Sequence, residues 1–178
     1  YILQIDLKDY FASIPHDKMK ELIRSKFTDQ RIIHLTEQFI DAFAEEKMKE
    51  MAQFKEAAME YGEEYARGLG SEICQICAVS YPDKVDHFVK DEKGIRPYAR
   101  YMDDSYIIHI DKEYLKEVLE RIREIYGSLG IRLNDKKTKI VKHSHGFTFL
   151  KTHFLLTDTG KVVKRICQDS VTRERRKL

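Results

Sequence analysis

The sequence predicts an α+β fold in which an antiparallel sheet packs against helices. Residues 1–7 (YILQIDL) are β-rich and mostly apolar, as is typical of a largely buried strand. Two further β-rich runs, residues 98–101 and 106–110, flank a pair of aspartates and predict a hairpin. Apolar residues recur at helical spacing before and after this hairpin. The order strand, helices, hairpin, helix and strands favours one sheet layer covered by helices.

The longest helical pattern covers residues 28–67 and has two apolar stripes. Thr28 or Asp29 can cap its beginning. The first stripe, which we expect to face inward, comprises Ile32, Ile33, Leu35, Phe39, Ile40 and Phe43. The second comprises Met48, Met51, Phe54, Ala58, Tyr61 and Tyr65. The spacing fits one long helix and equally a hairpin of two, and in both cases the stripes are expected to pack in the core.

Two shorter helices are expected before the hairpin. Ser13 and Pro15 predict a helix that begins just after the first strand, with Ser13 as its cap. A helix over residues 71–89 follows a glycine-rich break and should be interrupted near Pro82.

After the hairpin, Asp111 caps an amphipathic helix that ends near Gly130. Short β-like pieces follow at residues 131–133, 138–141, 147–150, 153–156 and 162–163. These pieces predict additional strands rather than further helices.

Length and composition are those of one domain. The chain has 178 residues, 42% of them hydrophobic, which is enough for a real core. We expect a domain over residues 1–156, with residues 28–67 as a helical insertion, and a basic segment over residues 157–178. That segment has seven Lys and Arg against two acids from residue 161 onward, although the net charge of the chain is only +2. The run suits a phosphate backbone and equally a solvated chain end.

Cysteine content and hydropathy indicate a cytoplasmic protein without a membrane partner. Cys74, Cys77 and Cys167 are too few for a disulfide framework and fit a reducing compartment. No apolar run approaches the ~20 residues that span a bilayer. Cys74 and Cys77 have the spacing of half a zinc site or a redox pair, but we expect them to be core residues. The first residue, Tyr1, opens directly on a strand, so we expect further sequence upstream.

Three carboxylates occupy positions that are energetically unfavourable for a negative charge. Asp6 ends an apolar strand, and Asp103 and Asp104 are adjacent in the hairpin. Adjacent acids repel each other unless a cation neutralises them, and their hard oxygens suit Mg²⁺. If the first strand lies beside the hairpin, the three acids meet and can hold two divalent ions. Aspartates also occur in hairpins simply as turn residues.

Five segments resemble, in order, the palm motifs of reverse transcriptases, in particular bacterial enzymes of the group II intron-like, retron and diversity-generating kinds. They are residues 6–16 (DLKDYFASIPH), 68–78 (GLGSEICQICA), 101–104 (YMDD), 130–138 (GIRLNDKKT) and 147–151 (FTFLK). The third matches the Tyr-x-Asp-Asp signature of the family. Two features depart from the relatives: the second segment lacks the common Pro-Gln-Gly, and intron-type enzymes have Ala where this chain has Met102.

The resemblance implies a polymerase palm that holds two Mg²⁺ ions, with Mn²⁺ as a substitute. Asp6 and Asp103 would be direct metal ligands, Asp104 a weaker one, and the backbone carbonyl of Leu7 a further ligand. The activity implied is RNA-directed DNA polymerisation, the transfer of deoxynucleotides (dNTPs) onto a primer 3′-OH. The partners implied are an RNA template and a DNA or RNA primer, together with other domains of a longer protein.

The resemblance also assigns the nucleotide and primer contacts. The nucleotide-binding residues would be Tyr10, Phe11, Gly70, Ser71, Gln75, Lys136 and Lys137. Phe11 would be a steric gate against the ribose 2′-OH, and one of the lysines a proton donor to pyrophosphate. Phe149, Leu150 and Lys151 would form the primer grip. Packing of Phe11 in the core, and a solvated lysine pair, are the simpler interpretations of these residues.

Most of the fingers and thumb of such a polymerase would lie outside this chain, so we expect the isolated chain to polymerise poorly. Other functions for a palm fold are open. A nucleotidyl cyclase would have a Gly-Gly-Asp/Glu-Glu-Phe hairpin, and a viral RNA polymerase would have Gly before the aspartate pair. A catalytically incompetent palm that binds RNA or protein would not need three clustered acids.

Overall fold

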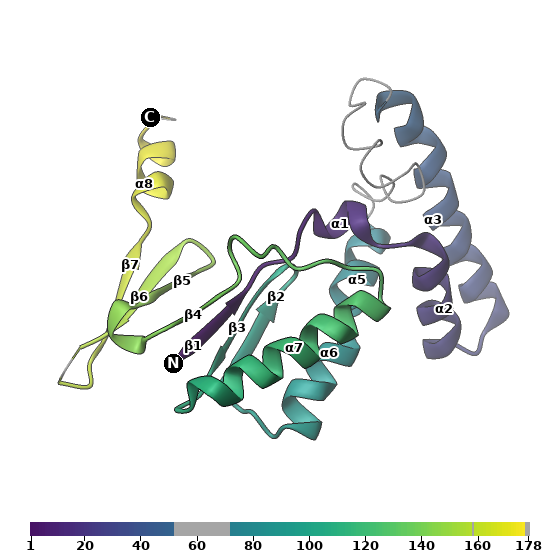
Figure 1. Cartoon of the computed structure of the whole chain (residues 1–178). Coiled ribbons are helices and arrows are strands. Elements are labelled where there is room, and N and C mark those ends of the chain that lie inside the picture. Colours follow the sequence, from purple (N-terminus) through teal and green to yellow (C-terminus); the bar gives the residue numbers. More distant parts are fainter. Residues whose placement is uncertain (52–71, 158, 177–178) are drawn as a thin grey trace.

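The computed structural model describes residues 1–51, 72–157 and 159–176, which form two antiparallel sheets and a set of helices (Figure 1). The strands are β1 (Ile2–Ile5), β2 (Tyr98–Tyr101), β3 (Asp104–Ile108), β4 (Lys139–Val141), β5 (Phe147–Phe149), β6 (Thr152–Leu156) and β7 (Val162–Ile166). The helices are α1 (Tyr10–Ser13), α2 (His16–Lys26), α3 (Gln30–Met51), α5 (Glu72–Ser80), α6 (Asp83–His87), α7 (Lys112–Ser128) and α8 (Gln168–Arg175). Two short turns of helix are η1 (Phe88–Glu92) and η2 (His143–His145). The predicted mixture of helices and antiparallel sheet is confirmed.

The first sheet has the order β2-β3-β1-β4, so the β-rich start of the chain lies in its interior. Leu3 of β1 and Ile107 of β3 pair across this sheet, and both are completely buried. Strand β1 ends opposite the start of β3, where Ile5 pairs with Ser105. Because the strands are antiparallel, the next residues outward from that pair are Asp6 and Asp104.

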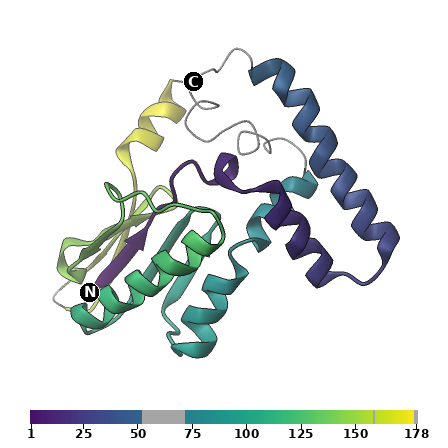
Figure 2. The same cartoon turned by 45° about the vertical axis from the view of Figure 1, so that its right-hand side comes forward.

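Helix α7 covers this sheet, with α6 beside it (Figures 1 and 2). Asp111 caps α7 as predicted, since its carboxylate accepts hydrogen bonds from the backbone N–H groups of Glu113 and Tyr114. The buried face of α7 consists of Leu115, Val118, Ile122 and Tyr126. Burial of each such side chain stabilises the fold by about 1.5–3 kcal/mol, so α7 is a main contributor to the core.

The N-terminal ends of the first helices differ from the prediction. Ser13 does not cap a helix: its buried hydroxyl donates to the carbonyl of Tyr10, within the short helix α1. Pro15 occupies the N-cap position of α2 instead, with no side-chain cap. The reason is that Asp9 adopts a left-handed conformation (φ 45°) and starts an extra helical turn between the strand and α2.

Helix α3 begins as predicted, because the carboxylate of Asp29 accepts a hydrogen bond of 2.9 Å from the N–H of Arg31. Its apolar stripe is only partly inward. Ile33 and Ile40 are buried, but the exposed fractions of Ile32, Leu35 and Phe39 are 45%, 54% and 41%, so the inward prediction was wrong for these three. Among the described elements α3 packs mainly on α2 and α5, which cover a narrower face than the sequence pattern suggested. Phe43 and the second stripe lie outside the described side chains and residues.

The helix predicted after the glycine-rich segment is interrupted at Pro82, as expected. It divides into α5 and α6, and Pro82 is the N-cap residue of α6. The glycines themselves lie outside the described residues.

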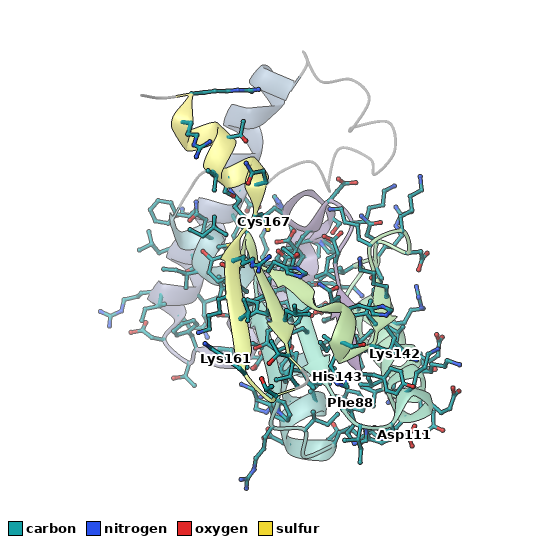
Figure 3. All side chains as sticks on the ribbon, turned by 90° about the vertical axis from the view of Figure 1, so that its left-hand side faces the viewer. Phe88, Asp111, Lys142, His143, Lys161 and Cys167 are labelled. Atoms are coloured by element: carbon teal, nitrogen blue, oxygen red, sulfur yellow. The ribbon has the colours of Figure 1, made fainter. Side chains whose placement is uncertain are left out.

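The second sheet, β5-β6-β7, meets the first through aromatic side chains. The ring of Tyr106, on β3, lies 5.0 Å from that of Phe147 and 4.9 Å from that of Phe149. The side-chain amide of Gln4, on β1, donates a 2.9 Å hydrogen bond to the carbonyl of Thr148. Strand β7 runs between the positions of Lys161 and Cys167 labelled in Figure 3. It pairs with β6, so hydrogen bonds cross the boundary that we expected at residue 156.

No helix in the described part of the chain is long and apolar enough to cross a membrane.

Candidate metal and nucleotide site

Asp6 directly follows β1 and is held there by the backbone. Its carbonyl accepts a 2.8 Å hydrogen bond from the N–H of Asn134. One carboxylate oxygen, Oδ2, accepts a hydrogen bond of 3.1 Å from the ammonium of Lys137. The other, Oδ1, is buried and has no hydrogen-bond partner among the residues that the structure describes. Because a buried charged oxygen without a partner is costly, this atom is suited to receive a cation.

Asp103 lies in the tight turn between β2 and β3, and Asp104 follows it in the chain. Tyr101 pairs with Asp104 across the hairpin, so the turn itself consists of Met102 and Asp103. The sequence prediction placed both aspartates at the tip, whereas Asp104 is the first residue of β3. Met102 has a φ of 53°, a left-handed conformation that costs a non-glycine residue about 1–2 kcal/mol. The turn is therefore strained at the residue before Asp103.

The three carboxylates influence one another electrostatically. Burial raises the pKa of Asp104, and the negative charges of Asp103 and Asp6 raise it further, while Lys137 acts in the opposite direction. The pKa of Lys137 is raised by its hydrogen bond to Asp6 and by the charges of Asp6, Asp104 and Asp103. Asp6 and Asp103 thus both act on Asp104 electrostatically, and a divalent cation beside these carboxylates would reduce their repulsion.

The donor set fits a hard cation that keeps part of its own hydration shell. No three acidic, histidine or cysteine side chains of the described residues are grouped closely enough to enclose an ion by themselves. Mg²⁺ does not require such an enclosure, because it is usually bound by one or two carboxylates together with waters and substrate phosphates. The free Oδ1 of Asp6 and the neighbouring Asp104 suit that kind of partial site.

A cavity of about 260 Å³ brings four of the predicted motifs together. Its lining residues are Gln4, Ile5, Asp6, Asp104, Ser105, Lys136, Lys137, Lys139, Thr148 and Phe149. Acids form one part of this wall and three lysines another. Such a surface can accept a metal ion and an anionic phosphate side by side.

Lys136 and Lys137 are presented by a turn that Asn134 organises. The N–H groups of Lys137 and Thr138 donate to the backbone carbonyl of Asn134, and the N–H of Lys136 donates to its side-chain oxygen. Lys136 is exposed, and the side chain of Lys137 is 67% exposed. Both ammonium groups can therefore reach a ligand in solution.

Tyr10 and Phe11 lie on α1, immediately beyond Asp6. Tyr10 is buried and donates a hydrogen bond to the carbonyl of Ala78, and burial raises the pKa of its hydroxyl well above the usual range. Phe11 is half-buried, and its ring meets that of Tyr10 edge-on at 5.3 Å. Tyr10 thus supports Phe11 from the core side, while part of the Phe11 ring stays accessible.

The remaining predicted nucleotide contacts are only partly described. Gly70 and Ser71 lie outside the described residues, and Gln75 is an exposed residue of α5. Cys77 is half-buried against the core, as predicted, whereas the side chain of Cys74 is outside the described set.

The predicted primer grip coincides with the turn between β5 and β6. Leu150 and Lys151 form this two-residue turn, because Phe149 pairs with Thr152. Their φ angles are 47° and 60°, and hairpin turns with both central residues in this region favour Asn-Gly. Leu150 and Lys151 are therefore unfavourable residues for the backbone of this turn. The residue before the turn, Phe149, lines the cavity.

Replacing this turn by Asn-Gly, as Leu150→Asn with Lys151→Gly, is expected to raise the melting temperature. Relief of left-handed strain is worth about 1 kcal/mol per residue, and each kcal/mol shifts the melting temperature of a domain this size by about 2–4 °C. Thermal unfolding followed by circular dichroism measures the effect. Leu150→Ala is the control, since it removes the side chain but keeps the strain. A double variant no more stable than that control would contradict the prediction.

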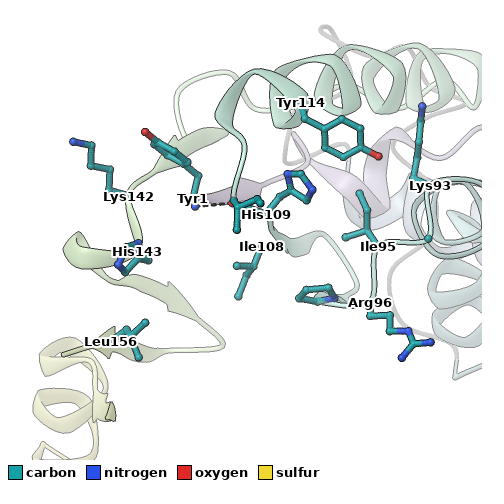
Figure 4. Close-up of a pocket in the computed structure, with 13 residues that line it drawn as sticks. Tyr1, Lys93, Ile95, Arg96, Ile108, His109, Tyr114, Lys142, His143 and Leu156 are labelled. Carbon is teal, nitrogen blue, oxygen red and sulfur yellow. Dashed lines mark hydrogen bonds between the residues drawn. The ribbon is translucent and has the colours of Figure 1, made fainter. Parts of the chain in front are cut away.

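A second cavity, of about 990 Å³, lies between the β3–α7 corner and the second sheet (Figure 4). Its wall includes Tyr1, Arg96, His109, Tyr114 and Lys142, and none of the aspartates Asp6, Asp103 and Asp104. It is therefore separate from the candidate site.

Sequence reasoning missed several residues that support the site. Arg100 and Asp86 form a largely buried ion pair beneath the hairpin, and Tyr98 donates a hydrogen bond to Asp86. Gln4 and Tyr106 connect the first sheet to the β5–β6 turn region. The available signal for Arg100 was its position in a strand expected to be partly buried, where a guanidinium requires an acidic partner.

An α+β fold with acids at a central strand end and an adjacent hairpin is typical of enzymes that handle phosphates through divalent metals. Comparison with protein families identifies the class directly: residues 1–154 match the family described as reverse transcriptase (RNA-dependent DNA polymerase). The chain belongs to this family, whose general activity is nucleotidyl transfer. A search of curated proteins found no match.

Proposed function

We propose that this chain is the palm of an RNA-directed DNA polymerase that extends a primer 3′-OH with dNTPs. The observation that carries the proposal is the buried, unpartnered Oδ1 of Asp6 beside the Asp103–Asp104 hairpin. A buried carboxylate oxygen without a partner is suited to bind a cation, and the chain belongs to the reverse transcriptase family.

Asp6 and Asp103 would hold two Mg²⁺ ions, with Asp104 as a weaker ligand and the Leu7 carbonyl as an additional one. Mn²⁺ would substitute, because it accepts the same oxygen ligands. Bound in this way, the ions supply charge stabilisation at the attacking and leaving oxygens of the transferred phosphoryl group.

The lysines of the 134–138 turn would act on the triphosphate. Lys137 pairs with Asp6 at 3.1 Å and is otherwise largely exposed. Its ammonium can exchange this carboxylate for a phosphate oxygen when Asp6 takes up a metal ligand role. From there Lys137 or Lys136 would donate a proton to the departing pyrophosphate.

Phe11 would face the sugar of the incoming nucleotide, supported from behind by Tyr10. Gly70, Ser71 and Gln75 would contact the nucleotide and the templating base. Phe149, Leu150 and Lys151 would brace the primer end, a role supported by the position of Phe149 in the wall of the cavity. The RNA template and the primer would lie across this same face.

Within the family, the bacterial group II intron-like, retron and diversity-generating enzymes are the proposed relatives. The support is the form of the first motif over residues 6–16, with Phe11 five residues after Asp6. The proposed domain division is a palm over residues 1–156 and a basic segment over residues 157–178, which adds strand β7 to the second sheet and then continues toward a thumb.

Primer extension tests the function. The full-length protein is given an RNA template, a labelled DNA primer, Mg²⁺ and either dNTPs or ribonucleotides. We expect extension with dNTPs that chelation of Mg²⁺ stops and that re-addition restores. Extension only with ribonucleotides would indicate an RNA polymerase. Absence of any extension, alongside tight RNA binding, would indicate a non-catalytic palm.

A further inference from the structure

Arg100 lies on β2, two residues before the Met102–Asp103 turn, and its side chain is only 9% exposed. A buried guanidinium is stable only when its charge and its hydrogen-bond donors are satisfied. Asp86, on α6, supplies both: it accepts hydrogen bonds from Nε at 2.9 Å and from Nη2 at 2.5 Å. The fork of the guanidinium is therefore fixed by an acid on a different element.

Tyr98 strengthens this anchor from the same strand. Its hydroxyl donates a 2.6 Å hydrogen bond to Oδ1 of Asp86. Burial acts to raise the pKa of Asp86, but the bonds from Arg100 and Tyr98 outweigh it and hold that pKa below its usual range. Asp86 thus stays ionised and keeps the guanidinium in place.

The other guanidinium donors reach two backbone carbonyls. Nη2 donates to the carbonyl of Val79, in the last turn of α5, at 3.0 Å. Nη1 donates to the carbonyl of Met102 over a longer distance of 3.4 Å. Met102 is the residue with a φ of 53°, and its carbonyl begins the peptide bond to Asp103. An interaction with this carbonyl therefore restricts the orientation of the strained peptide that carries Asp103.

We propose that Arg100 is a positioning residue for the metal-binding turn. Anchored by Asp86, its guanidinium holds the Met102 carbonyl and keeps the left-handed backbone that sets the place of Asp103. The same group ties this turn to the end of α5, the helix that carries the predicted nucleotide contact Gln75. The inference rests on the proposed function in one respect, that Asp103 binds a divalent ion.

If the buried ion pair only stabilised the fold, its loss would have a different experimental effect from the loss of a positioning residue. Its loss would lower the melting temperature and the amount of folded protein, but the affinity of the remaining folded molecules for metal would not change. Well below the melting temperature nearly all molecules of each variant are folded, so the measured dissociation constant is that of the folded protein, and metal affinity then separates positioning from stability. Lysine is the informative substitute for Arg100, because it keeps the charge but lacks the planar fork that reaches several acceptors at once.

The test measures Mn²⁺ binding to the full-length protein by electron paramagnetic resonance, together with melting temperature and primer extension. The variants are Arg100→Lys and Tyr98→Phe, which removes only one hydrogen bond to Asp86. Asp103→Asn shows which part of the Mn²⁺ binding depends on Asp103. Arg121→Lys is the matched control, since Arg121 is an exposed residue of α7 paired with Glu124.

We expect Arg100→Lys to weaken Mn²⁺ binding at the Asp103-dependent site about tenfold, equivalent to about 1.4 kcal/mol. Tyr98→Phe should weaken it about two- to threefold, or about 0.4–0.7 kcal/mol, and Arg121→Lys should leave it unchanged. An unchanged dissociation constant in both test variants would overturn the proposal, even if their melting temperatures fall. If Arg100→Lys does not fold, Tyr98→Phe decides in the same way.

The two proposals fail differently. A wild-type protein that binds Mn²⁺ through Asp103 without extending a primer on RNA refutes the polymerase function, while the variant series still decides the role of Arg100. A wild-type protein with no Asp103-dependent Mn²⁺ binding refutes the positioning role, because the turn then has no ion to place.

Discussion

Asp103→Asn in the full-length protein is expected to lower the rate of primer extension by about a hundred- to a thousandfold, on the scale of losing a preorganised group that stabilises transition-state charge. Asparagine preserves the shape of the side chain but supplies one neutral oxygen in place of a charged carboxylate. In our account Asp103 is a direct metal ligand, so this exchange removes a negative charge from the ion that the reaction needs.

The same substitution should not destabilise the fold. The charge of Asp103 contributes to the raised pKa of Asp104, which means that the two carboxylates repel each other. Removal of one charge relieves this repulsion, so the melting temperature of the metal-free protein should stay equal or rise. Loss of activity with unchanged or higher stability is typical of a residue retained for function.

Asp91→Asn is the matched control for this prediction. Asp91 is an exposed aspartate of η1, and its ion pair with His87 lies on the surface, where such pairs contribute little. Single-turnover extension at saturating dNTP gives the rates of both variants. If Asp103→Asn lowers the rate by less than about a hundredfold, or if both variants lose activity equally, the role assigned to Asp103 is contradicted.

Phe11→Ala is expected to change sugar selection by about a hundredfold, measured as the ratio of kcat/KM for dNTP to that for ribonucleotide. Phe11 follows Asp6 by five residues in the sequence. In the structure it is half-buried, and its ring meets that of Tyr10 edge-on. A ring held in this way on its inner side can exclude a 2′-OH on its accessible side. Alanine removes that obstruction and should admit ribonucleotides.

The competing explanation is that Phe11 only packs in the core. A fully buried phenylalanine replaced by alanine costs about 3–5 kcal/mol, and the half-buried Phe11 should cost less. Phe88→Ala provides the comparison, because Phe88 is a core phenylalanine 3% exposed on η1. It should destabilise the fold strongly and leave the nucleotide ratio unchanged. If Phe11→Ala behaves like Phe88→Ala, the gate hypothesis is wrong.

Local patterns predicted the elements that place the site. The apolar run before Asp6 indicated the interior strand, and the paired β-rich runs indicated the hairpin that brings Asp103 and Asp104 to it. The cap at Asp111 and the break at Pro82 were also predicted, because both depend on residues close in sequence. Such features follow from hydrogen-bond and backbone constraints that involve few residues.

Features that depend on tertiary partners were not predicted. The outward position of Leu35 on α3 follows from which helices cover it, and periodicity alone does not show this. The pairing of Arg100 with Asp86 joins residues 14 apart on different elements. The left-handed φ angles at Met102, Leu150 and Lys151 occur without glycine, the residue that normally indicates such angles, so the strained turns were not predicted.

Anomalous diffraction from crystals of the full-length protein with Mn²⁺, a primer–template and a non-hydrolysable dNTP tests the central claim most directly. Our account predicts two anomalous peaks beside the nucleotide triphosphate, one contacting Oδ1 of Asp6 and both within reach of Asp103. It also predicts that Lys137 leaves Asp6 for the phosphates. Mn²⁺ bound elsewhere, with Lys137 still on Asp6 in the presence of nucleotide, would contradict the account.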